Sequence, residues 1–226
     1  FFYSVAMRNR INKVATGHTT DDQAETVMMR IIKGTSMKGI SGIPPVRRQG
    51  RITYIRPLIE MEKKYILEFL KKGNIRYKID RTNQENKYFR NVIRNRVIPY
   101  LEKYNPQLKR SLSNLAETLR EDREFLESKK IEAQKGITHD RGSVILRMKD
   151  IVTQPTAIQK EITRDAVMHV GGNIKKFTFR HWKEIQLLIK TMPQGKSLDL
   201  PGNVKLAKKK GFLHFEKKSK AQNKKA

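Results

Sequence analysis

Cysteine is absent from this sequence of 226 residues. Its absence excludes a disulfide framework, a thiolate zinc site, a cysteine-ligated iron–sulfur cluster and a thiol nucleophile. We therefore predict a reducing compartment, the cytoplasm, for this chain. Long hydrophobic runs are absent as well, since no more than three apolar residues follow one another, whereas a membrane-spanning helix needs about 20. We expect no membrane partner.

Acidic residues are scarce, at 22 against 49 lysines and arginines, which leaves a net charge of +27. The excess is +13 in residues 1–100 and +14 in residues 101–226, so both halves of the chain attract a polyanion. Nucleic acid is the predicted partner, because neutralising its phosphates releases counterions. An anionic membrane would instead favour a basic helix with an apolar face. A basic protein without a polyanionic partner is the plain alternative.

Residue patterns predict alternating short elements in the N-terminal part of the chain. We expect a helix over 1–7, a strand over 13–16, a helix over 21–33, a strand over 51–56, a helix over 60–72, a strand over 77–79 and a helix from 88 to a break at Pro99. The glycines and prolines of residues 34–50 favour a loop without regular structure. Alternating strands and helices are typical of an α/β layer.

The later part of the chain is predicted to contain one long helix and a smaller mixed region. The expected elements are a helix over about 106–134, strands at 137 and 144–147, helices from about 155 and over 179–191, and strands over 197–200, 204–208 and 212–215. Trp182 is expected in the core, and the lysine-rich end is expected to be disordered. These patterns divide the chain into a first domain (1–105), a connector helix (106–135), a helical and β domain (136–216) and a tail (217–226).

The turn after the first strand and the start of the following helix are strongly specified. Thr19 or Thr20 can cap the helix, and Gly34 can end it. Asp22 and Glu25 are three residues apart near the helix start, so they lie side by side. They lie beyond the carboxyl end of a strand, which is where open α/β sheets bind ligands. Compensation of the helix dipole is the alternative explanation for these acidic residues.

Five motifs follow one another within about the first 105 residues. They are Gly17-His18-Thr19-Thr20-Asp21-Asp22-Gln23-Ala24-Glu25-Thr26, the Gly-rich loop from Gly34 to Pro44, Arg56-Pro57-Leu58, Asp80 with Thr82 and Asn83, and Tyr88 with Arg90, Asn91, Ile93 and Arg94. In this order they resemble the tRNA(Ile)-lysidine synthetase family. The region from residue 158 to the last strands resembles the helical and β substrate-binding region of that family more loosely.

The resemblance implies an α/β fold. It would be the C-terminal part of a Rossmann-like ATP-pyrophosphatase domain (adenine nucleotide alpha hydrolase-like), followed by a long helix and a smaller α+β substrate-binding domain. The implied reaction uses ATP, with Mg²⁺, to adenylate the carbonyl oxygen of the wobble cytidine in tRNA(Ile) with a CAU anticodon. Free L-lysine then displaces AMP to give lysidine. Whether the enzyme is a homodimer is left open.

One departure from the family pattern concerns ATP. The family's S-G-G-x-D-S loop, a backbone nest for phosphates, is not found in this sequence. We therefore expect a fragment that does not bind ATP normally by itself, and we expect the family's C-terminal region to be shortened or missing. A noncatalytic tRNA-binding remnant of the family is the alternative function. A related cytidine thiolase would need cysteines, which this chain lacks.

The site roles that the resemblance implies agree with elementary chemistry. Asp22 and Glu25 can bind one ammonium group of lysine while the other amine stays free to attack. His18 is assigned a catalytic role beside ATP, in adenylation or as a donor to a phosphate, and a solvated or structural histidine is the alternative.

A basic helix supplies the remaining candidates. Arg90, Asn91 and Arg94 are predicted to contact phosphate of ATP or tRNA, with a merely solvated charged face as the alternative. No metal ligands are assigned. Tyr54, Tyr88 and Phe89 are expected in the core rather than as platforms for stacked bases.

Overall fold

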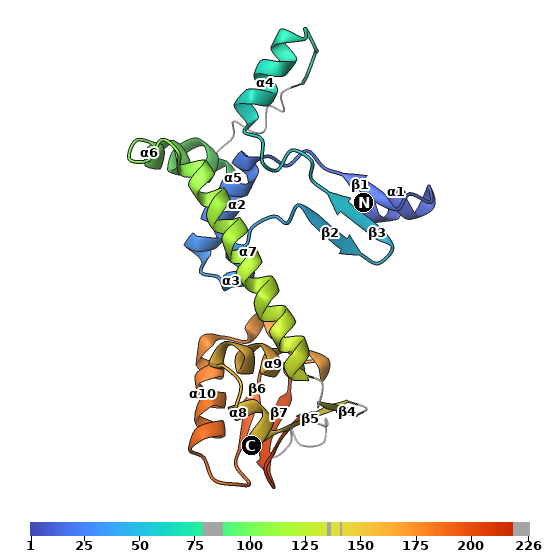
Figure 1. Ribbon diagram of the computed structural model, residues 1–226, viewed down its shortest axis with the longest axis vertical. Coiled ribbons are helices and arrows are strands. Elements are labelled where there is room, and N and C mark those ends of the chain that lie inside the picture. The colour runs from blue at the N-terminus through green and yellow to red at the C-terminus, as the bar shows by residue number, and fades with distance from the viewer. Residues whose placement is uncertain (79–87, 135–136, 141, 219–226) are drawn as a thin grey trace. The chain divides into compact units, whose positions relative to one another are not determined.

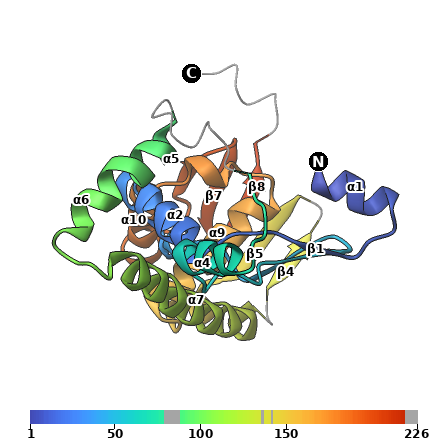
Figure 2. The same cartoon turned by 90° about the horizontal axis from the view of Figure 1, so that it is seen from above.

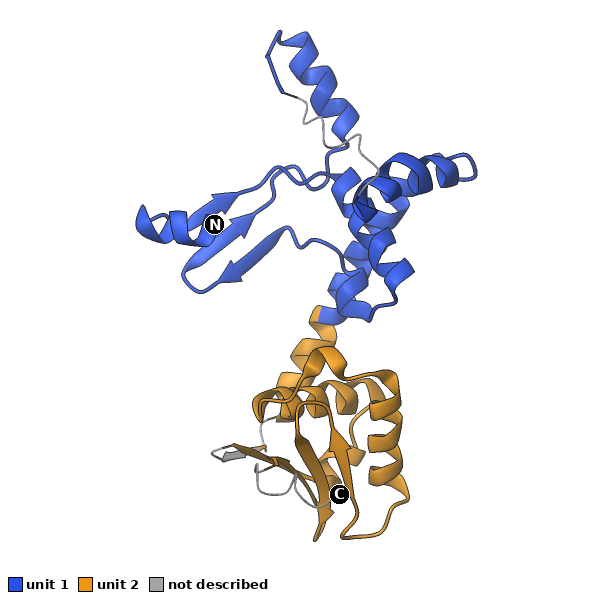
Figure 3. Cartoon of the chain, turned by 180° about the vertical axis from the view of Figure 1, so that it is seen from behind, with its two compact units in different colours: residues 1–123 blue, residues 124–226 orange. Residues whose placement is uncertain are grey.

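The computed structural model describes residues 1–78, 88–134, 137–140 and 142–218. The chain forms two compact units, Phe1–Arg123 and Glu124–Ala226 (Figure 3). The division between the units falls within the longest helix, α7 (Leu108–Ala133). None of the helices in the described ranges is both long enough and apolar enough to cross a membrane. The finer division predicted from the sequence, with a separate connector helix, remains a proposal.

The first unit contains a three-stranded mixed sheet in the order β1-β3-β2 (Figure 1). Its strands are β1 (Lys13–Ala15), β2 (Val46–Gln49) and β3 (Ile52–Ile55). β1 and β3 are parallel, while β2 and β3 form an antiparallel hairpin. The parallel pair requires a crossover connection, and this connection begins with helix α2.

Helix α2 (Thr20–Lys33) follows directly from β1 and is locally specified at both ends. The Thr19 hydroxyl accepts a hydrogen bond from the Asp22 amide, and the Asp22 carboxylate accepts one from the Thr19 amide, which completes a capping box. Gly34, at φ 71°, ends the helix. The apolar face of α2 packs into a core cluster that consists of Ala24, Val27, Met28, Ile93, Ile98, Leu112 and Ala116.

In its described residues, the first unit contains five further α-helices besides α2 and the first part of α7. They are α1 (Phe2–Arg8), α3 (Met37–Ile40), α4 (Lys63–Lys72), α5 (Phe89–Val92) and α6 (Ile98–Glu102). A π-helical turn, Ile93–Val97, joins α5 to α6 without a break. Its wider turn brings Ile93 and Ile98 into the core, where both are at most 2% exposed.

The second unit is a five-stranded antiparallel sheet, in the order β4-β5-β8-β7-β6, with packed helices (Figure 1). Its elements are β4 (Thr138–Asp140), β5 (Ser143–Arg147), α8 (Met148–Val152), α9 (Thr156–His169), a 3₁₀ turn (Ile174–Lys176), α10 (Phe179–Lys190), β6 (Ser197–Leu200), β7 (Val204–Lys209) and β8 (Phe212–Lys217). Trp182 is 3% exposed and packs in the core of this unit, as predicted.

Three predictions of secondary structure were wrong. Residues 34–50 contain α3 and β2, because β2 gains its hydrogen bonds from β3, a partner that local composition does not reveal. Tyr77 and Lys78 form no strand, and Ile79 lies outside the described residues. Pro99 stands in α6 rather than at a break, directly after the π turn, where the α-helical hydrogen-bond pattern is already interrupted.

Predictions about exposure also need correction. Tyr88 and Phe89 are 58% and 39% exposed, so neither is a core residue. Lys217 belongs to β8, because its backbone pairs with Val204, and the tail was therefore predicted to begin too early. Residues 219–226 of that tail lie outside the described residues, as do Asp80, Thr82 and Asn83 of the fourth motif.

Candidate functional site

A pocket of about 490 Å³ opens at the N-terminal end of α2. The turn after β1, the loop that follows β3, helix α4, the π turn, α6 and α7 all contribute to it, and all of these contributions belong to the first unit. Its walls are formed by Gly17, Thr19, Asp21, Asp22, Glu25, Leu58, Lys63, Ile66, Leu67, Arg94, Ile98 and Lys109. Acidic groups thus share the pocket with three cationic residues and an apolar wall.

Two carboxylates from α2 meet two guanidinium groups at one side of this pocket. Arg90 donates from Nε to Glu25 Oε2 at 2.7 Å and from Nη2 to Asp22 Oδ1 at 2.8 Å. Arg94 donates from Nε to Glu25 Oε1 at 2.6 Å and from Nη2 to Glu25 Oε2 at 3.0 Å. Asp22 is also held by its capping bond, so the cluster is fixed to the start of α2.

Burial makes this cluster electrostatically strong. The Glu25 side chain is 2% exposed, while those of Arg90 and Arg94 are 38% and 27% exposed. The hydrogen bond with Glu25 raises the pKa of Arg94, although burial acts in the opposite direction. Two negative and two positive charges balance within the four residues, so a cation that binds here must compete with an arginine.

Asp21 connects the pocket to two further helices. Its Oδ2 accepts a hydrogen bond from the backbone amide of Lys63, at the start of α4, at 2.7 Å. Its Oδ1 lies 3.1 Å from Nζ of Lys109 in α7, which is also 3.3 Å from Glu102. Burial lowers the pKa of Lys109, but the hydrogen bond and the charge of Asp21 outweigh it, and the net shift is upward. Asp21 therefore links α2 to α4 and α7 and stabilises the pocket wall.

His18 lies in the turn before α2. Its Nδ1 is 2.9 Å from the hydroxyl oxygen of Thr16. The pKa of His18 is lowered, mainly by burial and further by the charges of Arg56 and Arg90, while the charge of Asp22 opposes this shift. The imidazole is therefore neutral at physiological pH. A neutral imidazole can accept a proton, which suits a base better than a cationic phosphate contact.

Among the predicted site residues, the structure brings Asp22, Glu25, Arg90 and Arg94 together. Neither His18 nor Asn91 lines the pocket, and Asn91 is 7% exposed. Sequence reasoning missed Lys63 and Lys109, which line the same pocket. Their only local signal is charge, and charge is common in this chain.

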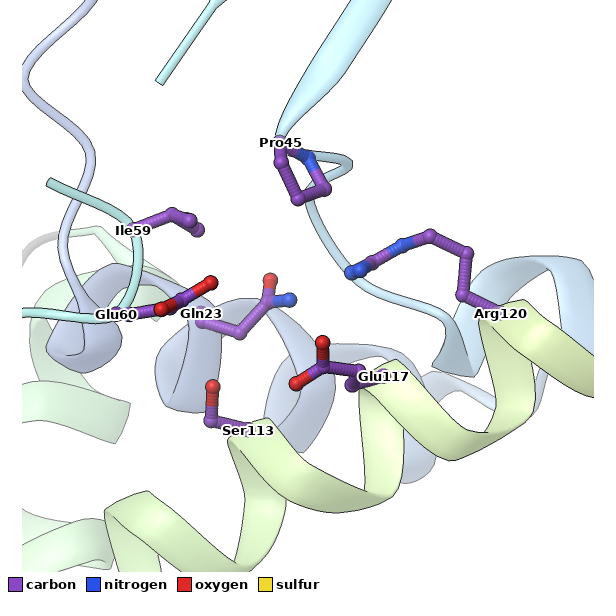
Figure 4. Close-up of a pocket in the computed structure, with 7 residues that line it drawn as sticks. All are labelled: Gln23, Pro45, Ile59, Glu60, Ser113, Glu117 and Arg120. Carbon is purple, nitrogen blue, oxygen red and sulfur yellow. The ribbon is translucent and has the colours of Figure 1, made fainter. Parts of the chain in front are cut away.

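A second cavity, of about 10 Å³, lies behind α2 and has room for roughly one water molecule. Figure 4 shows Gln23, Glu117 and Arg120 reaching toward the same gap. Gln23 is 2% exposed and pairs with the backbone of Ile43 through its carbonyl oxygen, at 2.6 Å, and its amide nitrogen, at 3.3 Å. Arg120 donates to the carbonyl oxygens of Ser41 and Ile43. The cavity is too small for a substrate. The hydrogen bonds of Gln23 and Arg120 around it fix the Gly-rich loop.

The described residues contain no group of three or more metal-binding side chains close enough to hold a metal ion. Mg²⁺ is usually bound by one or two carboxylates together with substrate phosphates and water. The carboxylates of this pocket are instead occupied by arginine and lysine. The part of the chain that the structure describes therefore shows no metal centre of its own.

Comparison with known families agrees with this architecture. Residues 1–101 match the PP-loop domain family. This part of the chain, which contains the pocket, is therefore similar to PP-loop domains.

Comparison with curated proteins is more specific. The chain is 32% identical over 215 residues to a tRNA(Ile)-lysidine synthase from Clostridioides difficile, which covers 94% of this chain and 46% of that protein. It is 36% identical over 209 residues to a tRNA(Ile)-lysidine synthase from Caldanaerobacter subterraneus, covering 92% of this chain and 44% of that protein. The chain is thus a relative of the tRNA(Ile)-lysidine synthases, and it spans about half the length of the curated relatives it matches.

A solved structure gives a weaker match. The U34-tRNA thiolase NcsA from Methanococcus maripaludis, determined with its [4Fe-4S] cluster, is 23% identical with a TM-score of 0.42. The match covers 52% of this chain and 39% of the thiolase chain.

Proposed function

We propose that this chain takes part in the ATP-dependent ligation of free lysine to the wobble cytidine of tRNA(Ile) with a CAU anticodon. The observation that carries the proposal is the pocket with two carboxylates at the start of α2, in a chain similar over more than nine tenths of its length to tRNA(Ile)-lysidine synthases. The net charge of +27 supports a tRNA partner.

The chemistry of the pocket suits lysine, which combines two amino groups, a carboxylate and an apolar stem. Asp22 and Glu25 offer carboxylate oxygens for an ammonium group. The methylene groups can pack against the apolar wall, and the lysine carboxylate can approach Lys63 or Lys109. The apolar wall consists of Leu58, Ile66, Leu67 and Ile98. A volume of about 490 Å³ is ample for one amino acid and leaves space for part of a nucleotide.

The proposed reaction has two steps. The cytidine carbonyl oxygen attacks the α-phosphorus of ATP, a new phosphorus–oxygen bond forms, and diphosphate leaves. An uncharged amine of lysine then attacks the activated ring carbon, and the carbon–oxygen bond to AMP breaks. The attacking nitrogen loses a proton in this step, and we assign its acceptance to His18, because a neutral imidazole can act as a base. Mg²⁺ would enter with the ATP phosphates and neutralise their charge.

Arg90 and Arg94 have a double role in this proposal. In the structure they neutralise Asp22 and Glu25. Guanidinium groups bind phosphate as well as carboxylate, through the same fork of donors. When a phosphate of ATP or tRNA engages these arginines, the two carboxylates become available to an ammonium group.

Binding of lysine to the 226-residue chain tests the pocket assignment. We expect isothermal titration to show binding of lysine and much weaker binding of norleucine, which has the same stem without the second amine. Asp22→Asn should weaken lysine binding by about tenfold or more, because a partly buried ammonium loses a charged partner. Asp150→Asn is the matched control, since Asp150 forms an exposed pair with Arg147 in the second unit.

Transfer of lysine tests the reaction itself. The complete protein, incubated with ATP, Mg²⁺, labelled lysine and an unmodified tRNA(Ile) transcript, should place label in the tRNA. The label should not enter a transcript in which the wobble cytidine is replaced by uridine. Binding of tRNA without any binding or transfer of lysine would overturn the proposal in favour of a noncatalytic RNA-binding protein.

A further inference from the structure

Tyr100 and Tyr104 form an exposed aromatic pair on the first unit. Their ring centroids are 5.6 Å apart, the ring planes meet at 64°, and the two hydroxyl oxygens lie 3.2 Å from each other. The residues are 55% and 75% exposed. Tyrosine is usually more buried than this, so core packing does not account for the pair.

The surroundings of the pair are basic. Nζ of Lys103 lies 5.8 Å from the centroid of the Tyr100 ring, and Arg96, Lys103 and Arg110 are exposed. The only acidic residue of the sequence between positions 96 and 110 is Glu102, and its carboxylate is engaged by Lys109. The surface around the two rings therefore attracts negative charge.

The pair lies close to the candidate site along the chain. α6 continues directly from the π turn, and Arg94 and Ile98 of this continuous segment line the pocket. The segment lies beside α2, whose first turns carry the carboxylates (Figures 1 and 2). From Ile98 to Tyr100 the rise along α6 is roughly 3 Å, and Tyr104 follows two residues after α6 ends at Glu102.

We propose that Tyr100 and Tyr104, with Lys103 beside them, are a stacking platform for unpaired bases of an RNA strand that leads to the pocket. This inference rests on the proposed function and deepens it, because it names residues that hold the RNA. In an edge-to-face pair, both faces of one ring and the outer face of the other are not covered by the partner ring. Unpaired bases stack on such faces, while flanking cations contact the phosphates.

The chemistry of the pair suits RNA better than an acidic protein surface. The phenol of Tyr104 is neutral near pH 7 and does not repel phosphate, because the ordinary pKa of tyrosine is about 10 and the hydrogen bond with Tyr100 raises the pKa of Tyr104 further. The two hydroxyls can also donate to ribose or phosphate oxygens. An RNA strand provides both the flat apolar faces and the negative charge that this surface matches.

Binding of two RNAs to the 226-residue chain tests the inference. The probes are a fluorescein-labelled oligouridine of 12 nucleotides and a labelled RNA duplex of the same length, both followed by fluorescence anisotropy. Tyr100→Ala combined with Tyr104→Ala should weaken binding of the oligouridine by about 5- to 150-fold for each base that loses its ring. Binding of the duplex should change little, and the salt dependence should keep its slope, because no charge is removed.

Two further variants serve as controls. Tyr100→Phe combined with Tyr104→Phe keeps the rings and should retain most of the affinity for the oligouridine. Tyr65→Ala removes another exposed tyrosine, in α4, whose neighbouring Lys64 is paired with Glu62 at 2.7 Å, and it should have little effect. Circular dichroism of each variant establishes that it is folded.

Several outcomes would overturn the inference. Unchanged affinity of the alanine variant, an equal loss for the duplex, or an equal loss in Tyr65→Ala would each do so. A wild-type dimer that the alanine substitutions dissociate, seen by light scattering, would make the pair a protein interface instead. If lysine binding and lysine transfer persist in any of these cases, the proposed function survives and only the stacking platform fails.

Discussion

Arg94 meets Glu25 through two hydrogen bonds, from Nε to Oε1 at 2.6 Å and from Nη2 to Oε2 at 3.0 Å. The Glu25 side chain is 2% exposed, so this bidentate pair is removed from water on its acidic side. The two residues are 69 positions apart, and their contact joins the start of α2 to the π turn. The pair therefore serves the stability of the first unit as well as its pocket.

Removal of one partner of this pair should destabilise the first unit. Arg94→Met leaves the buried carboxylate of Glu25 with Arg90 alone, and we expect a loss of about 3–5 kcal/mol in the free energy of unfolding. Urea denaturation followed by circular dichroism measures it. Arg180→Met is the control, because its pair with Glu184 is exposed and worth about 0.5 kcal/mol or less. Equal losses in both variants would contradict the assignment.

The shared arginines also predict that an anion strengthens lysine binding. Diphosphate should draw Arg90 and Arg94 away from Asp22 and Glu25, so that lysine no longer competes with them. Coupling of about 1–3 kcal/mol would lower the Kd of lysine by roughly 5- to 150-fold, and lysine would strengthen diphosphate binding by the same factor. Titrations of lysine with diphosphate and with chloride at equal ionic strength provide the comparison. Weaker or unchanged binding with diphosphate would speak against an exchange of partners.

Local features of the first unit could be predicted from the sequence because neighbouring residues determine them. The cap at Thr19, the end of α2 at Gly34 and the adjacency of Asp22 and Glu25 all follow from spacings of a few residues. The core face of α2 follows from its period for the same reason.

Features that depend on distant residues could not be predicted. The motifs suggested phosphate for Arg90 and Arg94 and an ammonium group for Glu25, but nothing local shows that these groups pair with each other across more than 60 residues. β2 was missed because its partner strand decides its structure. Tyr100 and Tyr104 lie in an amphipathic segment, and only the fold shows that this side of the segment is exposed.

Protonation of His18 should make the protein less stable in acid. Its pKa in the folded state lies below the value of 6.5 typical of an unfolded chain, so the unfolded state binds the proton more readily. Stability is then undiminished above pH 6.5 and falls as the pH decreases through the folded-state pKa. Unfolding in urea at pH 8, 6.5 and 5 should show a steeper loss for the wild type than for His18→Gln. An equal loss of stability with falling pH in the wild type and in His18→Gln would refute this account. An NMR titration midpoint above 6.5 for the His18 imidazole would also refute it.

Support of the Gly-rich loop by Gln23 predicts that Gly42 tolerates no side chain. A Cβ atom at Gly42 would lie 2.4 Å from Oε1 of Gln23, and the backbone φ of 63° is itself unfavourable for other residues. Gln23 is buried and bonded to Ile43, so it has little freedom to move aside. Gly42→Ala should therefore lower the free energy of unfolding by about 2–4 kcal/mol, which combines strain with the clash.

Gly211 provides the matched control for this prediction. It also has a positive φ, of 81°, but a Cβ atom there would meet nothing within 4 Å. Gly211→Ala should therefore show the backbone strain alone, on the order of 1 kcal/mol. Thermal and urea unfolding of both variants would separate the two contributions, and lysine titration of Gly42→Ala would report whether α2 has shifted. If Gly42→Ala loses no more free energy of unfolding than Gly211→Ala, the Gln23 side chain moves aside at little cost. The Gly-rich loop is then not fixed by Gln23.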